Sequence, residues 1–508
     1  TKLLYFGIYS KSMGVIQQQS IGQSIVNYIA TGIGAISILF IYPLDPDAYG
    51  LALFLTSTAA FLYPFASLGV TAISIRFFPD FEAPEERHRG FFMFLLLAAA
   101  FNFLLFVLFS LLVRAPGLRG LALLNFDVGL ILTYALPIYF LCFVIVLNIL
   151  LGNYISNFGK ITIPGVFTNL LPKLVLPALV LLIYFQAIDT QQFVLGILVY
   201  HLLITLGLAA YLARLGQLSL RLPALPARPT LGAMGSFGLY SMLSSVGSVF
   251  AFRIDHIMIS TLLQLSSTGL YGIAQFIGNS IEMPTRSVFG IASPVIAKAW
   301  KQNDLAQIQD IYRKASSNLL FVGTLVFLLI WLSLDDLFHL TPRYDELIQT
   351  RMIVFYVGMS KLVDMATSVN GQIITYSRYY RFNLYAVLFL GALNVLLNLW
   401  LIPRIGFTGA AIATFCSITF FNLFKAIFVF YRFRMHPFSR ELLRVLLLAA
   451  GAGLALSYLP ATPYPVANIA INSAAAGIFY FSAAWWFNLT PEVNGLLRKY
   501  LPGKSIKK

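Results

Sequence analysis

Residues 90–113 read GFFMFLLLAAAFNFLLFVLFSLLV, a run of 24 residues without a charged side chain. About 18 or more apolar residues in a row are enough for one helix to cross a bilayer. Similar runs recur along the chain, separated by short connections that contain Pro and Gly. A membrane barrel would instead show alternating segments of about 10 residues. We therefore expect an all-α polytopic membrane protein with about fourteen transmembrane helices. The predicted spans are residues 19–42, 49–75, 90–113, 128–150, 164–187, 192–213, 233–264, 268–293, 317–338, 348–376, 383–403, 406–431, 440–459 and 465–488.

The composition of the whole chain agrees with this assignment. The 508 residues are 59% hydrophobic and 10% charged, whereas a soluble domain is about 25% charged. The mean hydropathy is +0.82. Fourteen spans would use roughly 280 positions, which leaves no room for a separate globular domain.

The residues that commonly build metal or nucleotide sites are sparse. Cys142 and Cys416 lie in apolar runs, and the five histidines include no pair at metal-binding spacing. Gly503-Lys504-Ser505 resembles the end of a phosphate-binding loop but lacks the preceding glycine and the following helix. We expect no metal site, no cofactor and no ATP site in this chain.

The basic residues predict the orientation. With both termini in the cytoplasm, about 24 of the 34 Lys and Arg residues fall in inner segments and about 5 in outer loops, as the positive-inside rule requires. The net charge of +15 is then explained by topology and by anionic membrane lipids, not by nucleic-acid binding. We read the N-terminus as a cytoplasmic segment and not as a cleaved signal peptide.

Two halves of the chain resemble each other. Tyr49-Gly50 and Tyr271-Gly272 each open a predicted span and are each followed by a Pro and a Gly, and Asn169 is echoed by Asn394. Duplicated halves are a transporter pattern, so we expect two pseudo-symmetric six-helix lobes plus two C-terminal helices. The predicted domains are a first lobe at 1–215, a cytoplasmic linker at 216–232, a second lobe at 233–434, and two further helices with a basic tail at 435–508.

Ionisable side chains within the predicted spans are the candidate functional residues, because they are costly in a bilayer. Glu282 and Arg286 are four residues apart, and so a pair on one helix face would lower the cost of burying both. A structural interpretation is that Lys425 extends its side chain to the inner interface. The other cations, our candidates for substrate binding, are Lys173, Arg253, Arg286 and Lys361, and the candidates for a coupling or charge network are Asp255, His256, Glu282 and Asp364.

Lys361 and Asp364 are three residues apart and predict a second pair within one helix. Together the spans hold more cations than anions, and this excess favours an anionic substrate, with phosphate a good candidate. Two readings of the polar residues in the first span stay open: they line a vestibule for sugar, or they form hydrogen bonds between helices. These residues are Gln17, Gln18, Gln19, Gln23, Asn27 and Tyr28.

Several short motifs resemble the polysaccharide-transporter branch of the multidrug/oligosaccharidyl-lipid/polysaccharide (MOP) flippase superfamily. They are Asp47-Ala48-Tyr49-Gly50, Ser67-Leu68-Gly69, Arg76-Phe77-Phe78-Pro79, Ile254-Asp255-His256, Leu401-Ile402-Pro403 and Gly406-Phe407-Thr408-Gly409-Ala410-Ala411. The resemblance implies two six-helix lobes around a central cationic cavity, for which Lys173, Arg253, Arg286 and Lys361 are the candidates. The first span has no acidic residue, unlike many drug exporters of that superfamily.

The resemblance implies a flippase that works by alternating access and is not an enzyme. It would move an isoprenoid-pyrophosphate-linked oligosaccharide from the inner to the outer leaflet of a bacterial inner membrane. Its role would be cell-surface polysaccharide biosynthesis, such as that of lipopolysaccharide O-antigen. Its partners would be the lipid-linked sugar, membrane lipids and a coupling ion, H⁺ or Na⁺. One alternative is a multidrug/cation antiporter of the same superfamily. The other is an enzyme, a membrane glycosyltransferase, ligase or polymerase, which the short, acid-poor outer loops disfavour.

Overall fold

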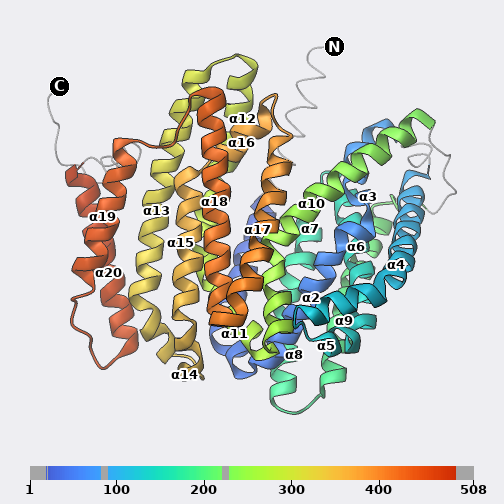
Figure 1. The fold of residues 1–508 in the computed structure, drawn as a ribbon, viewed down its shortest axis with the longest axis horizontal. Coiled ribbons are helices and arrows are strands. Elements are labelled where there is room, and N and C mark those ends of the chain that lie inside the picture. The colour runs from blue at the N-terminus through green and yellow to red at the C-terminus, as the bar shows by residue number, and fades with distance from the viewer. Residues whose placement is uncertain (1–18, 20, 82–89, 220–227, 488–508) are drawn as a thin grey trace. The chain divides into compact units, whose positions relative to one another are not determined.

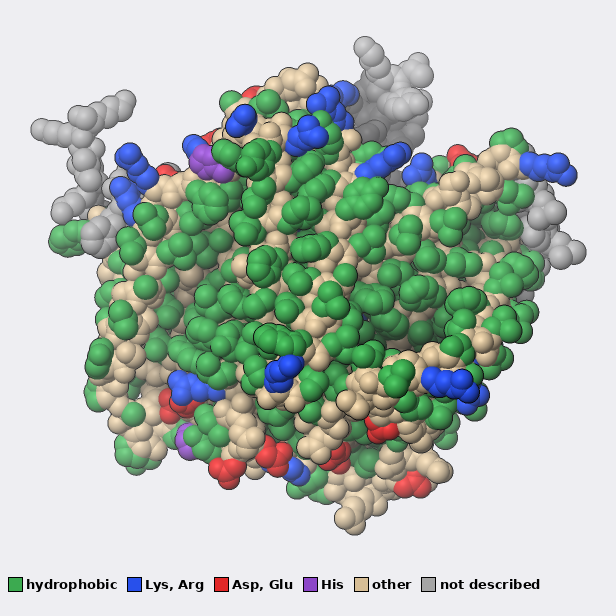
Figure 2. Space-filling view, in the orientation of Figure 1, with side chains coloured by type: hydrophobic (Ala, Val, Ile, Leu, Met, Phe, Trp, Pro, Cys, Tyr) green, Lys and Arg blue, Asp and Glu red, His purple; other side chains and the backbone are tan. Residues whose placement is uncertain are grey.

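The computed structural model describes residues 19, 21–81, 90–219 and 228–487, and every regular element in these ranges is helical (Figure 1). Within these described ranges, ten helices are long and apolar enough to cross a membrane, or up to twelve if each of two bent pairs is one span. The predicted spans 268–293 and 440–459 are also helical but lie outside this count, so the number fourteen stays a prediction. In Figure 2 the middle of each unit's surface is mainly hydrophobic, with charged side chains toward the helix ends.

The packing divides the chain into two units, one up to Gly269 and one from Leu270 onward. This division places the seventh predicted span in unit 1. The division reflects packing and does not test the predicted repeat or the predicted linker between the lobes. Of that linker, at 216–232, residues 220–227 lie outside the described ranges.

Unit 1 contains the first six predicted spans and the seventh. Its first span is Ile21–Leu44, which ends in the π-helical turn η1 (Ser37–Ile41) and the 3₁₀ turn η2 (Tyr42–Leu44). The remaining helices are α2 (Pro46–Ser67), α3 (Val70–Arg76), η3 (Phe78–Phe81), α4 (Phe91–Leu123), α5 (Val128–Thr133), α6 (Ala135–Ser156), α7 (Thr162–Gly165), η5 (Val166–Leu170), α8 (Leu171–Tyr184), α9 (Thr190–Arg214) and α10 (Arg228–Leu262).

The second predicted span is broken into α2 and α3. Leu68 and Gly69 both have positive φ, at 43° and 78°, and a Cβ at Gly69 would collide with the backbone of Gly238 in α10. Glycine is therefore required at position 69 for two reasons. Asn102 donates a hydrogen bond to the carbonyl of Ser67 (3.1 Å) and Asn153 to that of Thr71 (2.9 Å), so side chains satisfy backbone groups near the break.

The first turn of α11 (Leu265–Asn279) packs directly against the backbone of α2. A Cβ at Gly50 would overlap the carbonyl oxygen of Leu265, and a Cβ at Gly269 would overlap that of Pro46. Glycine at these two positions lets the two backbones touch, as small residues do between membrane helices.

Unit 2 is built around a long central helix, α13 (Leu305–His339). The last two helices pack on it, with Tyr480 donating to Thr324 (2.6 Å) and Asn468 to Asp336 (2.8 Å) (Figure 1). The helices of this unit after α11 are η6 (Ser280–Glu282), α12 (Met283–Lys301), α13, α14 (Tyr344–Leu347), η7 (Ile348–Thr350), α15 (Arg351–Thr367), α16 (Asn370–Tyr376), α17 (Phe382–Ile405), α18 (Phe407–Phe433), α19 (Arg440–Leu456) and α20 (Pro465–Phe487).

Candidate functional site

In unit 1, Arg253 lies where α10 changes direction. The two parts of α10, Arg228–Phe250 and Arg253–Leu262, meet at 53°. The Arg253 side chain is exposed and interacts electrostatically with Lys173 and with the phenol of Tyr49. Tyr49 is in turn stacked on Tyr42, with ring centroids 3.9 Å apart. Among the described residues, Arg253 has no ion-pair partner.

Lys173 reaches this region from α8. Its aliphatic chain lies against Gly34 of the first span, because a Cβ at Gly34 would be 3.4 Å from Lys173 Cδ and 3.7 Å from Nζ. The structure thus brings Lys173 and Arg253, two of the four predicted cavity cations, together in unit 1.

The neighbours of Arg253 on α10 lie in a different environment. Asp255 and His256 are buried, with 1% and 4% of their surface exposed. His256 Nδ1 is 3.0 Å from the hydroxyl of Ser57 in α2. These two coupling candidates therefore lie inside unit 1 at the packing of α10 on α2, while Arg253 is exposed.

In unit 2, an ion pair joins two helical segments. Lys361 Nζ of α15 is 2.5 Å from Glu282 Oε2, at the 3₁₀ turn between α11 and α12. The predicted pairing of Glu282 with Arg286 is wrong: among the described residues Arg286 forms no ion pair, and its side chain is exposed on α12. The turn η6 breaks the helical spacing on which the i,i+4 prediction depended.

Asp364 has a different main partner from the one its spacing suggested. Its carboxylate accepts a hydrogen bond from Asn422 of α18 (3.0 Å), whose amide oxygen accepts one from Asn370 of α16 (3.3 Å). Asp364 also interacts electrostatically with Lys425, Glu282 and Lys361. Lys361 and Asp364 do interact, but their direct partners lie on other helices.

The position of Lys425 near the end of a span predicts a side chain at the membrane interface, and the structure corrects this prediction. Its side chain is only 7% exposed, with Nζ 4.1 Å from the centre of the Phe421 ring. A Cβ on Gly371 would be 3.4 Å from Nζ, beside the 49° break between α15 and α16. Lys425 thus belongs to the charge network of unit 2, and its wide separation in sequence from Asp364 hid this relation.

The polar residues of the first span form hydrogen bonds between helices. Gln19 accepts from the backbone N–H groups of Ile161 and Thr162 (3.2 and 3.1 Å), and Asn27 accepts from Asn169 (3.0 Å). Of the two readings left open, this one is confirmed for Gln19 and Asn27. Gln17 and Gln18 lie outside the described residues.

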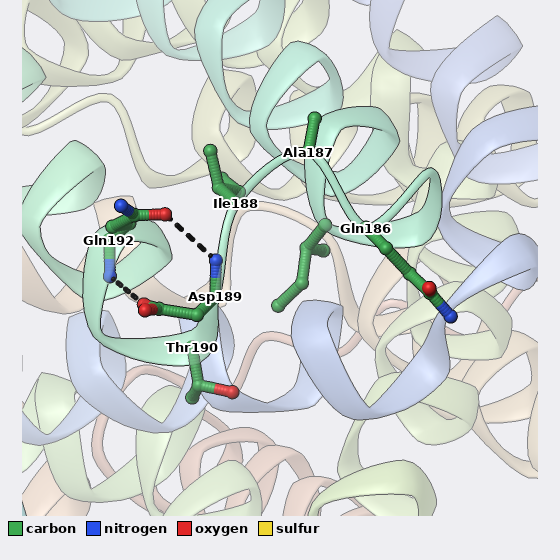
Figure 3. A pocket seen from close by; sticks show the side chains of 7 residues that line it. Gln186, Ala187, Ile188, Asp189, Thr190 and Gln192 are labelled. Carbon is green, nitrogen blue, oxygen red and sulfur yellow. Dashed lines mark hydrogen bonds between the residues drawn. The ribbon is translucent and has the colours of Figure 1, made fainter.

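The described residues of unit 1 line at least two hollows. The first, about 460 Å³, is formed by the loop between α8 and α9 (Figure 3). Asp189 and Gln192 there cap each other's backbone, with hydrogen bonds of 2.7 and 3.0 Å that fix the start of α9. The second hollow, about 470 Å³, lies between the first span, α6 and the α7–η5 segment.

Solved structures of other proteins share this architecture. No family model and no curated protein matches the sequence. A structure of the lipid II flippase MurJ in an inward closed conformation matches with a TM-score of 0.68 and 14% identity, covering 92% of this chain and 99% of that one. An inward-facing multidrug resistance MATE family transporter of the MOP superfamily matches with a TM-score of 0.59 and 14% identity, covering 80% and 94%. The chain is therefore a multi-pass membrane protein with the fold of MOP superfamily transporters.

Proposed function

We propose that this protein is a lipid-linked oligosaccharide flippase. Its substrate is a sugar joined to an isoprenoid through pyrophosphate, moved from the inner to the outer leaflet of a bacterial cytoplasmic membrane for cell-surface polysaccharide synthesis. The prenyl chain stays in lipid while the head group crosses along the protein, by alternating access between two six-helix lobes. Both termini are cytoplasmic in this proposal.

The observation that carries the proposal is the proximity of Arg253 and Lys173. Two cations within electrostatic range of each other repel, and a bound anion lowers the energy of both. Arg and Lys are the usual protein ligands of phosphate, Arg through paired hydrogen bonds. Because Arg253 is exposed and has no ion-pair partner among the described residues, its guanidinium is available to a pyrophosphate.

In unit 2, the proposal assigns one cation to the substrate and two carboxylates to ion coupling. Arg286 is the remaining substrate-binding candidate of this unit, since Lys361 is paired with Glu282. Glu282 and Asp364 are the carboxylates for coupling to H⁺ or Na⁺, with Asp255 and His256 as candidates in unit 1. The likeness of the fold to that of the lipid II flippase MurJ supports a lipid-linked substrate.

The test is leaflet transfer in proteoliposomes. A fluorescent polyprenyl-pyrophosphate sugar is followed by its accessibility to an impermeant quencher, with wild-type protein, Arg253→Gln and Arg404→Gln. Arg404 lies over Trp400 near the end of α17 and is the control. We expect transfer by the wild type and the control and a large loss in Arg253→Gln. No transfer above protein-free vesicles would contradict the proposal.

A second candidate is a multidrug/cation antiporter, favoured by the likeness to the MATE transporter fold and by the acidic residues in unit 2. In that case Glu282→Gln and Asp364→Asn abolish transport, whereas Arg253→Gln has little effect.

A further inference from the structure

The second hollow of unit 1 is polar but carries no charge. Its polar lining residues are Gln23, Asn148, Asn153, Thr168 and Asn169, and Gly152 forms part of its wall. A volume of about 470 Å³ falls within the usual range of ligand pockets, roughly 300–1,000 Å³. Among the described residues, no Lys, Arg, Asp, Glu or His lines it, so none of these residues holds or rejects a ligand there by charge.

Part of the polar lining keeps hydrogen-bonding capacity. Asn148 already uses both ends of its amide, since it donates to the carbonyl of His201 and accepts from Thr205. Gln23 donates to Asn27 (3.2 Å), but its amide oxygen is buried and has no hydrogen-bond partner among the described residues. Asn153 donates to Thr71, and this leaves its amide oxygen as an acceptor. Several groups there can therefore bind hydroxyl or amide groups of a ligand.

The wall formed by η5 has an unusual backbone. Val166–Leu170 is a π-helical turn, and it presents Thr168 and Asn169 with exposed side chains. Turns of this kind are rare and often occur at functional sites.

One wall of the hollow and Lys173 belong to the same helical segment, α7–η5–α8. The first span and the α7–η5–α8 segment pair in register: Gln19 with Thr162, Gln23 with Gly165, Asn27 with Asn169, and Gly34 with Lys173. Asn169 and Lys173 are four residues apart, about 6 Å along a helix. Lys173, which interacts with Arg253, therefore lies about one helical turn from the Asn169 end of the hollow.

We infer that this amide-lined hollow binds the uncharged sugar portion of the substrate while Lys173 and Arg253 bind its phosphate. The inference rests on the proposed function and adds a subsite to it. An apolar drug would favour a hydrophobic, aromatic wall, and an ion would favour a charged one. Neutral hydroxyl and acetamido groups match amide and hydroxyl side chains that both donate and accept.

Gly152 allows the hollow to be filled without deleting a hydrogen bond. A Cβ at Gly152 meets no atom within 4 Å, and the same is true of Gly117 in α4, which does not line the hollow. Gly152→Leu is therefore the test variant and Gly117→Leu the matched control. Thr168→Val removes one lining hydroxyl with little change of shape, as a second variant if Gly152→Leu does not fold.

The measurement is leaflet transfer of two lipids by the full-length protein: polyprenyl pyrophosphate alone, and the same lipid carrying the neutral sugar that the wild type transfers. We expect Gly152→Leu to slow the sugar-bearing lipid by about tenfold or more and to leave the bare lipid unchanged. Gly117→Leu should behave as wild type with both.

The other outcomes separate this inference from the proposed function. If Gly152→Leu and Thr168→Val transfer both lipids like the wild type, the hollow holds water only and the inference is wrong. Equal loss of both lipids would assign the hollow to general transport instead of sugar recognition, which also overturns it. If the wild type transfers neither lipid, the proposed function itself fails.

Discussion

Lys361 Nζ lies 2.5 Å from Glu282 Oε2, and this ion pair ties α15 to the turn that separates α11 from α12. The Lys361 side chain is 12% exposed and that of Glu282 is 38% exposed. Loss of Glu282 would therefore leave a mostly buried ammonium without its close partner, which is costly.

We predict that Lys361→Met and Glu282→Gln each destabilise the protein, and that the double variant loses less than the sum. The coupling energy should be about 1–2 kcal/mol, within the range for contacting residues. It is measured by a double-mutant cycle on unfolding in detergent. Gln309→Ala, at the hydrogen bonds of Gln309 with His436, paired with Glu282→Gln is a control that should be additive. Additivity of Lys361→Met with Glu282→Gln would show that the pair contributes nothing.

A second prediction concerns Lys425 and Asp364. Lys425→Met should lower stability by about 1–3 kcal/mol, because the half-buried carboxylate of Asp364 then loses the stronger of the two cations that interact with it. Asp364→Asn in the same chain removes that charge and should restore part of the loss. The measurement is the unfolding midpoint of the single and double variants. A Lys425→Met protein as stable as wild type would support the interfacial placement that the sequence suggested.

The sequence predicts the membrane helices of this protein better than its ion pairs. Long apolar runs and the bias of Lys and Arg identify membrane helices, because each span depends mostly on its own composition. The motif order identified the superfamily fold that the MurJ and MATE structures share. Pairing by helical spacing failed for Glu282 and Arg286, and it found only a secondary interaction for Lys361 and Asp364 within α15.

Ion pairs between helices could not be predicted in this way. The partner of Glu282 is 79 positions away, and that of Asp364 is on α18. The breaks at Gly69, η6 and Ser368 interrupt regular α-helix within a predicted span, and the break at Ser368 bends the chain by 49°. Only the glycine at 69 gave a local signal, and Ser368, with φ of 40°, gave none. The hollow beside Gly152 depends on three segments and had no signature in any one of them.

A third prediction tests the broken second span. Gly69→Ala should cost at least about 2 kcal/mol, since its Cβ meets the backbone of Gly238 in a left-handed conformation. Gly117→Ala, in a helix with open space around it, should be neutral or more stable by up to about 1 kcal/mol. Thermal unfolding of both variants in the same detergent provides the comparison. Equal midpoints would mean that α2 and α10 separate to accommodate a methyl group.

The fourth prediction concerns the strength of the Arg253 contact. Loss of a hydrogen-bonded charge contact costs about 1.5–3 kcal/mol, which corresponds to roughly tenfold or more in affinity. Arg253→Gln should weaken binding of polyprenyl pyrophosphate by that factor and leave binding of the uncharged polyprenol unchanged. Arg253→Lys keeps the charge and should lose less than Arg253→Gln. Equal affinity of wild type and Arg253→Gln for polyprenyl pyrophosphate would show that Arg253 does not bind the pyrophosphate.

The most direct test of the account compares two cargoes in one preparation of vesicles. Transfer of a polyprenyl-pyrophosphate sugar and uptake of a cationic dye against a proton gradient are measured for wild type, Arg253→Gln with Lys173→Gln, and Glu282→Gln. The account predicts transfer of the lipid-linked sugar by the wild type, its loss in the Arg253 and Lys173 variant, and no dye uptake. Dye uptake that is lost in Glu282→Gln and kept in the Arg253 and Lys173 variant, without lipid transfer by any protein, would contradict it.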